Sequence, residues 1–216
     1  NRCCIDVRSR VDLGWDALGA YSKGHIAGAQ FLAFDRVFAR DPIFELGRHP
    51  WPDRRTVAAH LLGVLGPAGN ALSRVIFYDD GGMNFAARAA LCARWAGCTN
   101  AQILDGGLSA WARCGLPLDE GAPVAADHPA VERVNDFLRQ TIAGAVPQML
   151  GKAAFFNAVK QDDRLVIDGR PRERFAGRTE TLDARPGHVP GAVNRPATEN
   201  LNADGSLKSR EALRRE

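Results

Sequence analysis

The sequence predicts an α/β fold, a parallel sheet flanked by helices, in two related domains of which the second is incomplete. Strand-like and helix-like segments alternate through the first half of the chain, a pattern typical of parallel sheets. A repeat relates the two halves. Residues 5–8 (Ile-Asp-Val-Arg) and 24–29 (Gly-His-Ile-Ala-Gly-Ala) recur as 167–170 (Ile-Asp-Gly-Arg) and 187–192 (Gly-His-Val-Pro-Gly-Ala).

The first domain is expected to span residues 1–118 and to open with a strand at 3–7. The apolar residues 30–34 predict either a short second strand or a turn. Asp53 is expected to cap a helix whose apolar residues recur at helical spacing until Gly66 ends it. These segments give the first strand, a crossover and a covering helix.

The alternation continues through the rest of this domain. Residues 73–78 are β-branched and aromatic, and they predict a buried strand that ends before a glycine loop. A helical pattern starts at Phe85 and ends at Gly97, which suits a left-handed helix cap. Residues 102–104 predict a third strand and 108–113 a further helix.

Residues 119–150 are expected to form a linker, because they begin with a polar, small-residue stretch that lacks periodicity. A helix after Val131 would then cross between the domains. The second domain, 151–216, is expected to hold a helix at 152–159 and a strand at 165–168.

The second copy of the repeat stops before the counterpart of the strand and glycine loop at 75–82. An α/β domain without its central strands has an unpaired sheet edge. Residues 165–167 would then expose apolar faces, so we expect residues after about 150 to be poorly ordered, or packed against the first domain or a neighbouring chain.

The net charge is +3, and the excess of basic residues falls within 151–216. Several cations crowd into 170–178 and Arg185, but acidic residues interrupt them, unlike a nucleic-acid-binding stripe. No apolar run approaches the roughly 20 residues of a membrane span. The predicted ligand is a small anion, with neither nucleic acid nor membrane as a partner.

The five cysteines form neither a Cys-x-x-Cys pair nor a Cys/His metal spacing. Their odd number argues against a disulfide framework. Cys3, Cys4, Cys92 and Cys98 are expected to be small buried hydrophobic residues, and none of the five is a good candidate nucleophile. The cytoplasm is the predicted location, because it keeps thiols reduced.

Several motifs occur together in one order. The two repeated motifs are joined by a strand ending in Tyr78 and Asp79 before a glycine loop, and by residues 104–107 (Leu-Asp-Gly-Gly) followed by Trp111. Residues 47–50 (Gly-Arg-His-Pro) and 202–205 (Asn-Ala-Asp-Gly) add to the pattern. With these motifs the chain closely resembles the tandem-domain rhodanese family, the thiosulfate and 3-mercaptopyruvate sulfurtransferases.

The resemblance implies a five-stranded parallel sheet in each domain and a catalytic cysteine on a loop of the C-terminal domain. It also implies transfer of sulfane sulfur from a small anionic donor, through a cysteine persulfide, to a thiophilic acceptor. Neither a metal nor an organic cofactor is implied. The nucleophilic cysteine is expected after Glu216, so we expect this chain to be inactive alone, and both donors stay open.

Asp79 stands where an active copy would carry the loop cysteine. A loop whose backbone N–H groups converge, followed by a helix N-terminus, stabilises a thiolate or persulfide. A carboxylate cannot carry sulfane sulfur. The resemblance then implies that the first domain is a non-catalytic scaffold that lines the cleft between the domains.

Arginine suits the recognition of flat oxyanions, because its fork binds two oxygens at once. By resemblance, Arg174 and Arg185 match substrate-binding positions, and Arg170 lies four residues before Arg174. The alternatives are solvated surface arginines or pairing of Arg174 with an acid such as Asp168.

The remaining candidates are expected to have structural roles near the site. Asp168 follows a strand and could hold Arg170 or the backbone of the next turn. His25 and His188 lie beside glycines and are expected to bond backbone groups rather than transfer protons. The rival to a sulfurtransferase is a non-catalytic rhodanese-like binding or regulatory module.

Overall fold

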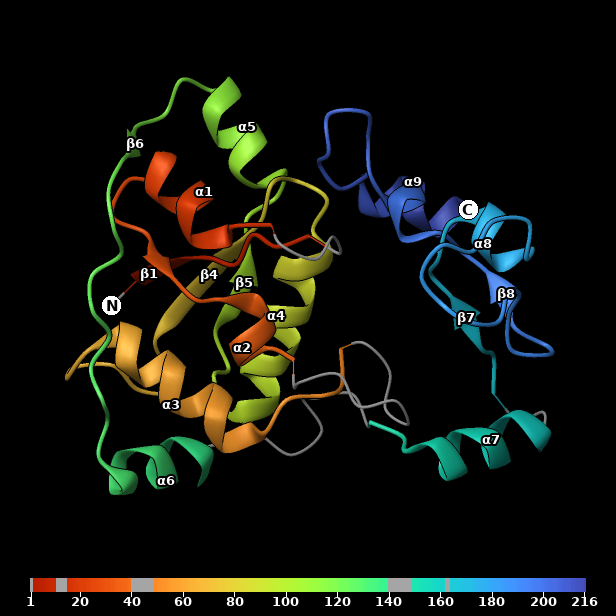
Figure 1. Ribbon diagram of the computed structural model, residues 1–216, viewed down its shortest axis with the longest axis horizontal. Coiled ribbons are helices and arrows are strands. Elements are labelled where there is room, and N and C mark those ends of the chain that lie inside the picture. Colours follow the sequence, from red (N-terminus) through yellow and green to blue (C-terminus); the bar gives the residue numbers. More distant parts are fainter. Residues whose placement is uncertain (1, 11–14, 40–48, 140–148, 162–163) are drawn as a thin grey trace. The chain divides into compact units, whose positions relative to one another are not determined.

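The computed structural model describes residues 2–10, 15–39, 49–139, 149–161 and 164–216 (Figure 1). The chain divides into two compact units, Asn1–Val146 with Asp204–Ser206, and Pro147–Ala203 with Leu207–Glu216. The first unit therefore extends beyond the boundary expected at residue 118.

A parallel sheet forms the centre of the first unit. Its order is β3 (Gln30–Phe31), β1 (Arg2–Asp6), β4 (Arg74–Tyr78) and β5 (Ala101–Ile103). All three pairings are parallel. The resemblance implied five strands, and this sheet has four in the described part of the chain. A separate antiparallel pair joins β2 (His25–Ile26) to β6 (Leu118–Asp119).

Helices cover both faces of this sheet (Figure 1). They are α1 (Ala17–Lys23), α2 (Phe34–Val37), α3 (Arg54–Leu65), α4 (Asn84–Ala96), α5 (Gly107–Arg113) and α6 (Val131–Arg139). Side chains of β1 alternate between the two faces: Ile5 lies in the large core that α3 and α4 complete, and Cys4 packs in a smaller cluster with Tyr78 and Trp111.

Local signals placed helices α3 and α4 of the first unit correctly. The side chain of Asp53 accepts the backbone N–H of Thr56, which caps α3, and Gly66 follows its last residue. Gly97 ends α4 with a φ of 122°, where a residue with a Cβ would be strained. The strand predicted at 73–78 is confirmed as β4.

Helix α6 differs from the expected linker. Val134 and Phe137 are buried in the same core as α3 and α4. The Arg54 guanidinium, on α3, donates to the backbone oxygen of Leu138 at 3.0 Å. Apolar burial therefore holds α6 within the first unit instead of leaving it to cross between domains.

The second unit contains little regular structure. Its elements are α7 (Lys152–Lys160), β7 (Ile167–Asp168), α8 (Arg172–Phe175), β8 (Val193–Asn194), a 3₁₀ turn η1 (Ala197–Asn200) and α9 (Arg210–Arg215). Strands β7 and β8 pair in parallel, as β1 and β3 do in the first unit. Their two-stranded sheet has no other strand in the described part of the chain.

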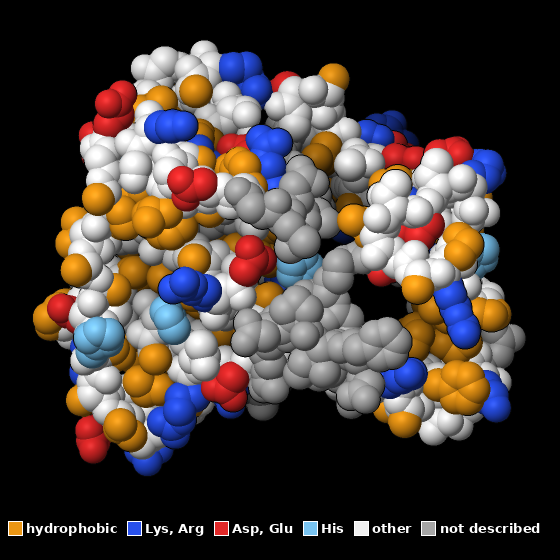
Figure 2. Space-filling model, viewed as in Figure 1, with side chains coloured by type: hydrophobic (Ala, Val, Ile, Leu, Met, Phe, Trp, Pro, Cys, Tyr) orange, Lys and Arg blue, Asp and Glu red, His pale blue; other side chains and the backbone are white. Residues whose placement is uncertain are grey.

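Apolar residues of the second unit reach its surface (Figure 2). Leu165 is 71% exposed and Ile167 59%, as expected for a sheet face without a covering layer. Pro196 is its only buried residue among those that the structure describes. Within those same ranges, no helix combines the length and the apolar character needed to cross a membrane.

Candidate anion-binding site

The first copy of the repeated motif forms a closed turn after β1. The Asp6 carboxylate accepts the backbone N–H of Arg8 at 2.9 Å and the Nε of the same residue at 2.9 and 3.1 Å. The Arg8 Nη2 then donates to the Gly24 carbonyl oxygen at 2.8 Å. The Asp-x-Arg pair therefore fastens the strand end to the Gly-His turn.

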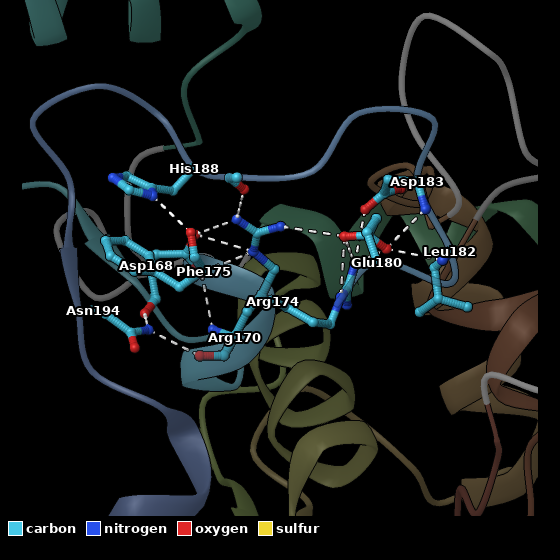
Figure 3. A network of polar contacts seen from close by, with 10 residues as sticks. Asp168, Arg170, Arg174, Phe175, Glu180, Leu182, Asp183, His188 and Asn194 are labelled. Carbon is cyan, nitrogen blue, oxygen red and sulfur yellow. Dashed lines mark hydrogen bonds and ion pairs between the residues drawn. The ribbon is translucent and has the colours of Figure 1, made fainter. Parts of the chain in front are cut away.

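The second copy reproduces these contacts (Figure 3). The Asp168 carboxylate accepts the backbone N–H of Arg170 at 2.9 Å and its Nε at 3.0 and 3.1 Å. The Arg170 Nη2 donates to the Gly187 carbonyl oxygen at 2.6 Å. This bonding holds the pKa of Asp168 below its usual range.

The two histidines are also equivalent. His25 stacks on Tyr21 with ring centroids 3.8 Å apart, and its Nδ1 lies 2.9 Å from the Tyr21 carbonyl oxygen. His188 stacks on Phe175 at 3.7 Å, and its Nδ1 lies 2.7 Å from the Phe175 carbonyl oxygen. A carbonyl oxygen only accepts, so Nδ1 carries the hydrogen in both rings.

The glycine loop after β4 encloses the side chain of Asp79, which is buried. Oδ1 accepts the backbone N–H groups of Gly81 and Met83 at 2.9 and 3.0 Å. Oδ2 accepts those of Phe85 and Ala86, both at 3.1 Å, at the start of α4. Four backbone donors therefore converge on one carboxylate, which fills the anion cradle of this loop.

The Leu-Asp-Gly-Gly motif packs against that loop. The Leu108 backbone N–H donates to the Asp79 carbonyl oxygen at 2.8 Å, and the Ser109 hydroxyl donates to the Asp80 carbonyl oxygen. A Cβ at Gly107 would lie 2.4 Å from the Asp79 carbonyl oxygen. The glycine thus permits a close approach that supports the loop from behind.

Arg174 binds two acidic side chains in the second unit (Figure 3). Its Nη2 lies 2.9 Å from both oxygens of Glu180, and its Nε lies 3.2 Å from Oε2. The same Nη2 donates to Asp183 Oδ2 at 2.9 Å. The arginine fork therefore holds a carboxylate in the two-oxygen geometry that suits planar oxyanions.

Known proteins match this chain along nearly its whole length. The model of the rhodanese-like domain matches residues 1–114. A putative thiosulfate sulfurtransferase, SseB of Mycobacterium tuberculosis, is 32% identical over 211 residues, which are 97% of this chain and 69% of that protein. The chain belongs to the rhodanese family.

Two further relatives support membership of the rhodanese family. The 3-mercaptopyruvate sulfurtransferase of Escherichia coli K12 is 34% identical over 198 residues, 89% of this chain and 63% of that protein. The crystal structure of SseA from Escherichia coli, a 3-mercaptopyruvate sulfurtransferase, superposes with a TM-score of 0.75 at 28% identity, and covers 99% of this chain and 75% of its own. These relatives are sulfur-transferring enzymes, and this rhodanese chain spans about two thirds of their length.

The three arginines predicted from the rhodanese motifs lie in different settings. Arg170 and Arg174 both approach Glu180, with Arg170 Nη1 3.9 Å from its Oε2. Arg185 is exposed and forms no hydrogen bond or ion pair with the described residues. The structure pairs Asp168 with Arg170 and not with Arg174.

The sequence motifs did not reveal Glu180 and Asp183 as partners of Arg174. Both lie in the irregular segment between α8 and β8, where no periodicity links an acid to an arginine six or nine residues earlier. The interruption of the basic cluster by acidic residues was the one available signal. The Gly-Arg-His-Pro motif lies partly outside the described residues, which include only its His49 and Pro50.

Four of the five cysteines are poor nucleophiles, because burial raises their pKa values. All five are free thiols, and burial raises the pKa of Cys3 and Cys98 to about 11 and of Cys4 and Cys92 to about 12. Cys114 is exposed, but it lies after α5, away from the glycine loop in sequence. Within the described ranges, no three His, Cys, Asp or Glu side chains are grouped to hold a metal ion.

Proposed function

We propose that the protein to which this chain belongs transfers sulfane sulfur from thiosulfate or 3-mercaptopyruvate to a thiophilic acceptor. The transfer uses a cysteine persulfide on the C-terminal domain. The single observation that carries the proposal is the carboxylate held in the Arg174 fork, since both donors present anionic oxygens of similar geometry. The names of the relatives support sulfur transfer as the reaction class.

The reaction consists of two displacements at sulfur. The cysteine thiolate attacks the outer sulfur of thiosulfate, and sulfite leaves with the electron pair of the broken S–S bond. The acceptor, for example cyanide, then attacks the outer sulfur of the persulfide, and the thiolate is restored. Arg174 and Arg185 bind the anionic end of the donor, so that its sulfur is presented to the thiolate.

Arg170, Asp168 and His188 act as structural residues of this site. Their bonds to backbone groups hold the turn after β7 and the Gly-His turn in fixed positions. That placement fixes the start of α8, which carries Arg174. The same contacts around Asp6 and His25 support this structural role, because they recur in the non-catalytic first domain.

The nucleophile is proposed to lie after Glu216, in the part of the second domain that this chain does not cover. In the first domain the place of the cysteine is filled by Asp79, whose carboxylate already satisfies the four loop donors. Burial raises the pKa of four of the five cysteines, which keeps them as thiols at neutral pH. The five free thiols also support the cytoplasm as the location.

The glycine loop occupied by Asp79 is equally compatible with the second candidate, a non-catalytic binding or regulatory module. The two differ in one respect: a module needs no persulfide, whereas the enzyme forms one when it meets a donor. Wild-type complete protein that turns over neither thiosulfate nor 3-mercaptopyruvate would favour the module.

The test compares two arginine variants of the complete protein, measured as sulfur transfer to cyanide. Arg174→Gln is expected to raise the KM for the donor by about tenfold or more, because it removes a two-oxygen ion pair. Arg178→Gln is the matched control, since Arg178 pairs only with the exposed Glu173 in the described contacts. Equal KM values for the two variants would exclude Arg174 as the donor-binding residue.

A further inference from the structure

The proposed donor site already contains an anion of the protein itself. Glu180 contacts Arg174 through both of its oxygens, and its side chain is 5% exposed. We propose that Glu180 is a built-in competitor for the donor, which must displace it from Arg174 to bind. This inference rests on the proposed function, because it takes Arg174 as the donor-binding residue.

The contacts of Glu180 make the competition direct. The Nε and Nη2 edge of Arg174 forms parallel bonds to the two carboxylate oxygens, at 3.2 and 2.9 Å. An arginine has one such edge on its Nε side, so a donor carboxylate or sulfonate in the same geometry must take the place of Glu180. Arg170 Nη1, 3.9 Å from Oε2, adds a second positive charge to the same position.

Glu180 also organises the segment that carries it (Figure 3). Its Oε1 accepts the backbone N–H groups of Leu182 and Asp183 at 2.8 and 2.9 Å. The side chain therefore links Arg174 to the segment between α8 and β8. Displacement of Glu180 by a donor would release both backbone groups, so binding of an anion and rearrangement of this segment are coupled.

Asp183 has a different position. Its Oδ2 accepts a hydrogen bond from Arg174 Nη2 at 2.9 Å, and its side chain is 45% exposed. Its charge is screened by water more strongly than that of Glu180. Asp183 therefore serves as a matched acidic control on the same segment.

The experiment measures anion binding by isothermal titration of the complete protein with thiosulfate and with pyruvate. Pyruvate carries the carboxylate of 3-mercaptopyruvate without its sulfur. Glu180→Gln keeps an oxygen that accepts the Leu182 and Asp183 N–H groups but removes the competing charge. It is expected to lower the Kd of both anions by about tenfold, whereas Asp183→Asn changes it by about twofold or less. Adding Arg174→Gln to Glu180→Gln should abolish the gain.

An unchanged or higher Kd in a folded Glu180→Gln protein would overturn the inference. If that variant does not fold, the wild-type protein decides the question: pyruvate should shift the amide NMR signals of Leu182 and Asp183, and unshifted signals at saturation would overturn it. The proposed function fails separately. If Glu180→Gln lowers the Kd but the complete protein transfers no sulfur, the competition by Glu180 stands and the proposed enzymatic function fails. If the protein transfers sulfur but Glu180→Gln leaves the Kd unaltered, the proposed function stands and the competition by Glu180 fails.

Discussion

In the first unit the side chain of Asp6 is fully buried and that of Arg8 is 7% exposed, whereas those of Asp168 and Arg170 are 14% and 30% exposed. The hydrogen bonds within the two pairs are nevertheless the same. A turn of this kind is specified by residues close in sequence. Its burial depends on strands and helices that only the first unit contains among the described residues.

Asp79 in the first unit and Glu180 in the second also differ in what holds their carboxylates. Asp79 is held by backbone N–H groups inside a buried loop, and Glu180 is held by arginines on an irregular segment. Asp79 places its carboxylate where an active copy of the domain would hold a thiolate. Glu180 places its carboxylate where the proposed donor would bind. Asp79 is held in place by buried backbone donors, whereas our proposal requires that a donor anion can displace Glu180.

Removal of the Asp79 carboxylate is expected to have the largest effect. Asp79→Ala leaves four converging N–H groups without a partner and should lower the free energy of unfolding of the first unit by about 4 kcal/mol. Urea unfolding followed by tryptophan fluorescence measures it, because all four tryptophans lie in the first unit. A loss below about 1 kcal/mol would contradict the role of the cradle.

Asp79→Cys tests the same cradle chemically. The loop donors should hold the new thiol below its ordinary pKa of about 8.5, in contrast to the buried native cysteines. The control is Ser73→Cys, at a buried position outside the loop. Thiolate absorbance against pH distinguishes them, and equal pKa values would show that the loop does not stabilise an anion.

A matched pair of substitutions compares the two copies of the turn. Asp6→Ala removes the close partner of the buried Arg8, leaves it only the longer contact to Asp80 at 3.9 Å, and should cost about 3 kcal/mol. Asp168→Ala should cost about 1 kcal/mol or less, because water reaches Arg170. Urea unfolding reports the first, and amide hydrogen exchange across the turn after β7 reports the second. Equal costs would mean that burial does not separate the two copies.

Acid should affect the contributions of Glu180 and Asp80 in opposite directions. The Leu182 N–H and the Arg174 guanidinium lower the pKa of Glu180 from 4.5 to about 2, so its stabilising contribution is complete above pH 4.5 and lost as the pH falls toward 2. Burial raises the pKa of Asp80, so protonation of that group relieves a cost as the pH falls. Carboxyl-carbon NMR titrations would measure both, and a Glu180 midpoint near its ordinary value would contradict the arginine contacts.

Thiol reactivity should show the smallest effect. An aromatic disulfide reagent is expected to modify Cys114 rapidly and the four other cysteines only on unfolding, because Cys114 alone is exposed among the five. Cys114→Ser should abolish the rapid phase. A rapid phase that remains in this variant would mean that at least one of the other four cysteines is accessible.

Most elements of the first unit follow from short-range signals in the sequence. The Asp53 cap, the ends of α3 and α4 and the strand β4 each depend on residues within one element. Helix α6 was not recognised as part of this unit, since its partner α3 lies far earlier in the chain. The pairing of β2 with β6 was not predicted for the same reason, because the two strands lie far apart in the sequence.

The candidate site was predictable to a lesser extent. The motif pattern led to Arg174, Arg185 and Asp79, but it did not reveal what each side chain contacts. The Glu180 and Asp183 pairing with Arg174 depends on the path of an irregular segment, for which sequence periodicity gives no guide. The partners of Arg174 in this segment are therefore visible only in the three-dimensional structure.

The central claim is that sulfur is carried by a cysteine of the C-terminal domain outside residues 1–216, with this chain supplying the donor site. The complete protein is treated with thiosulfate, and the mass of its peptides is measured under non-reducing conditions. The account predicts a gain of one sulfur atom on a peptide beyond Glu216 and none on the five cysteines of this chain. Sulfur on Cys114 or on any other of these five, or no gain at all, would contradict it.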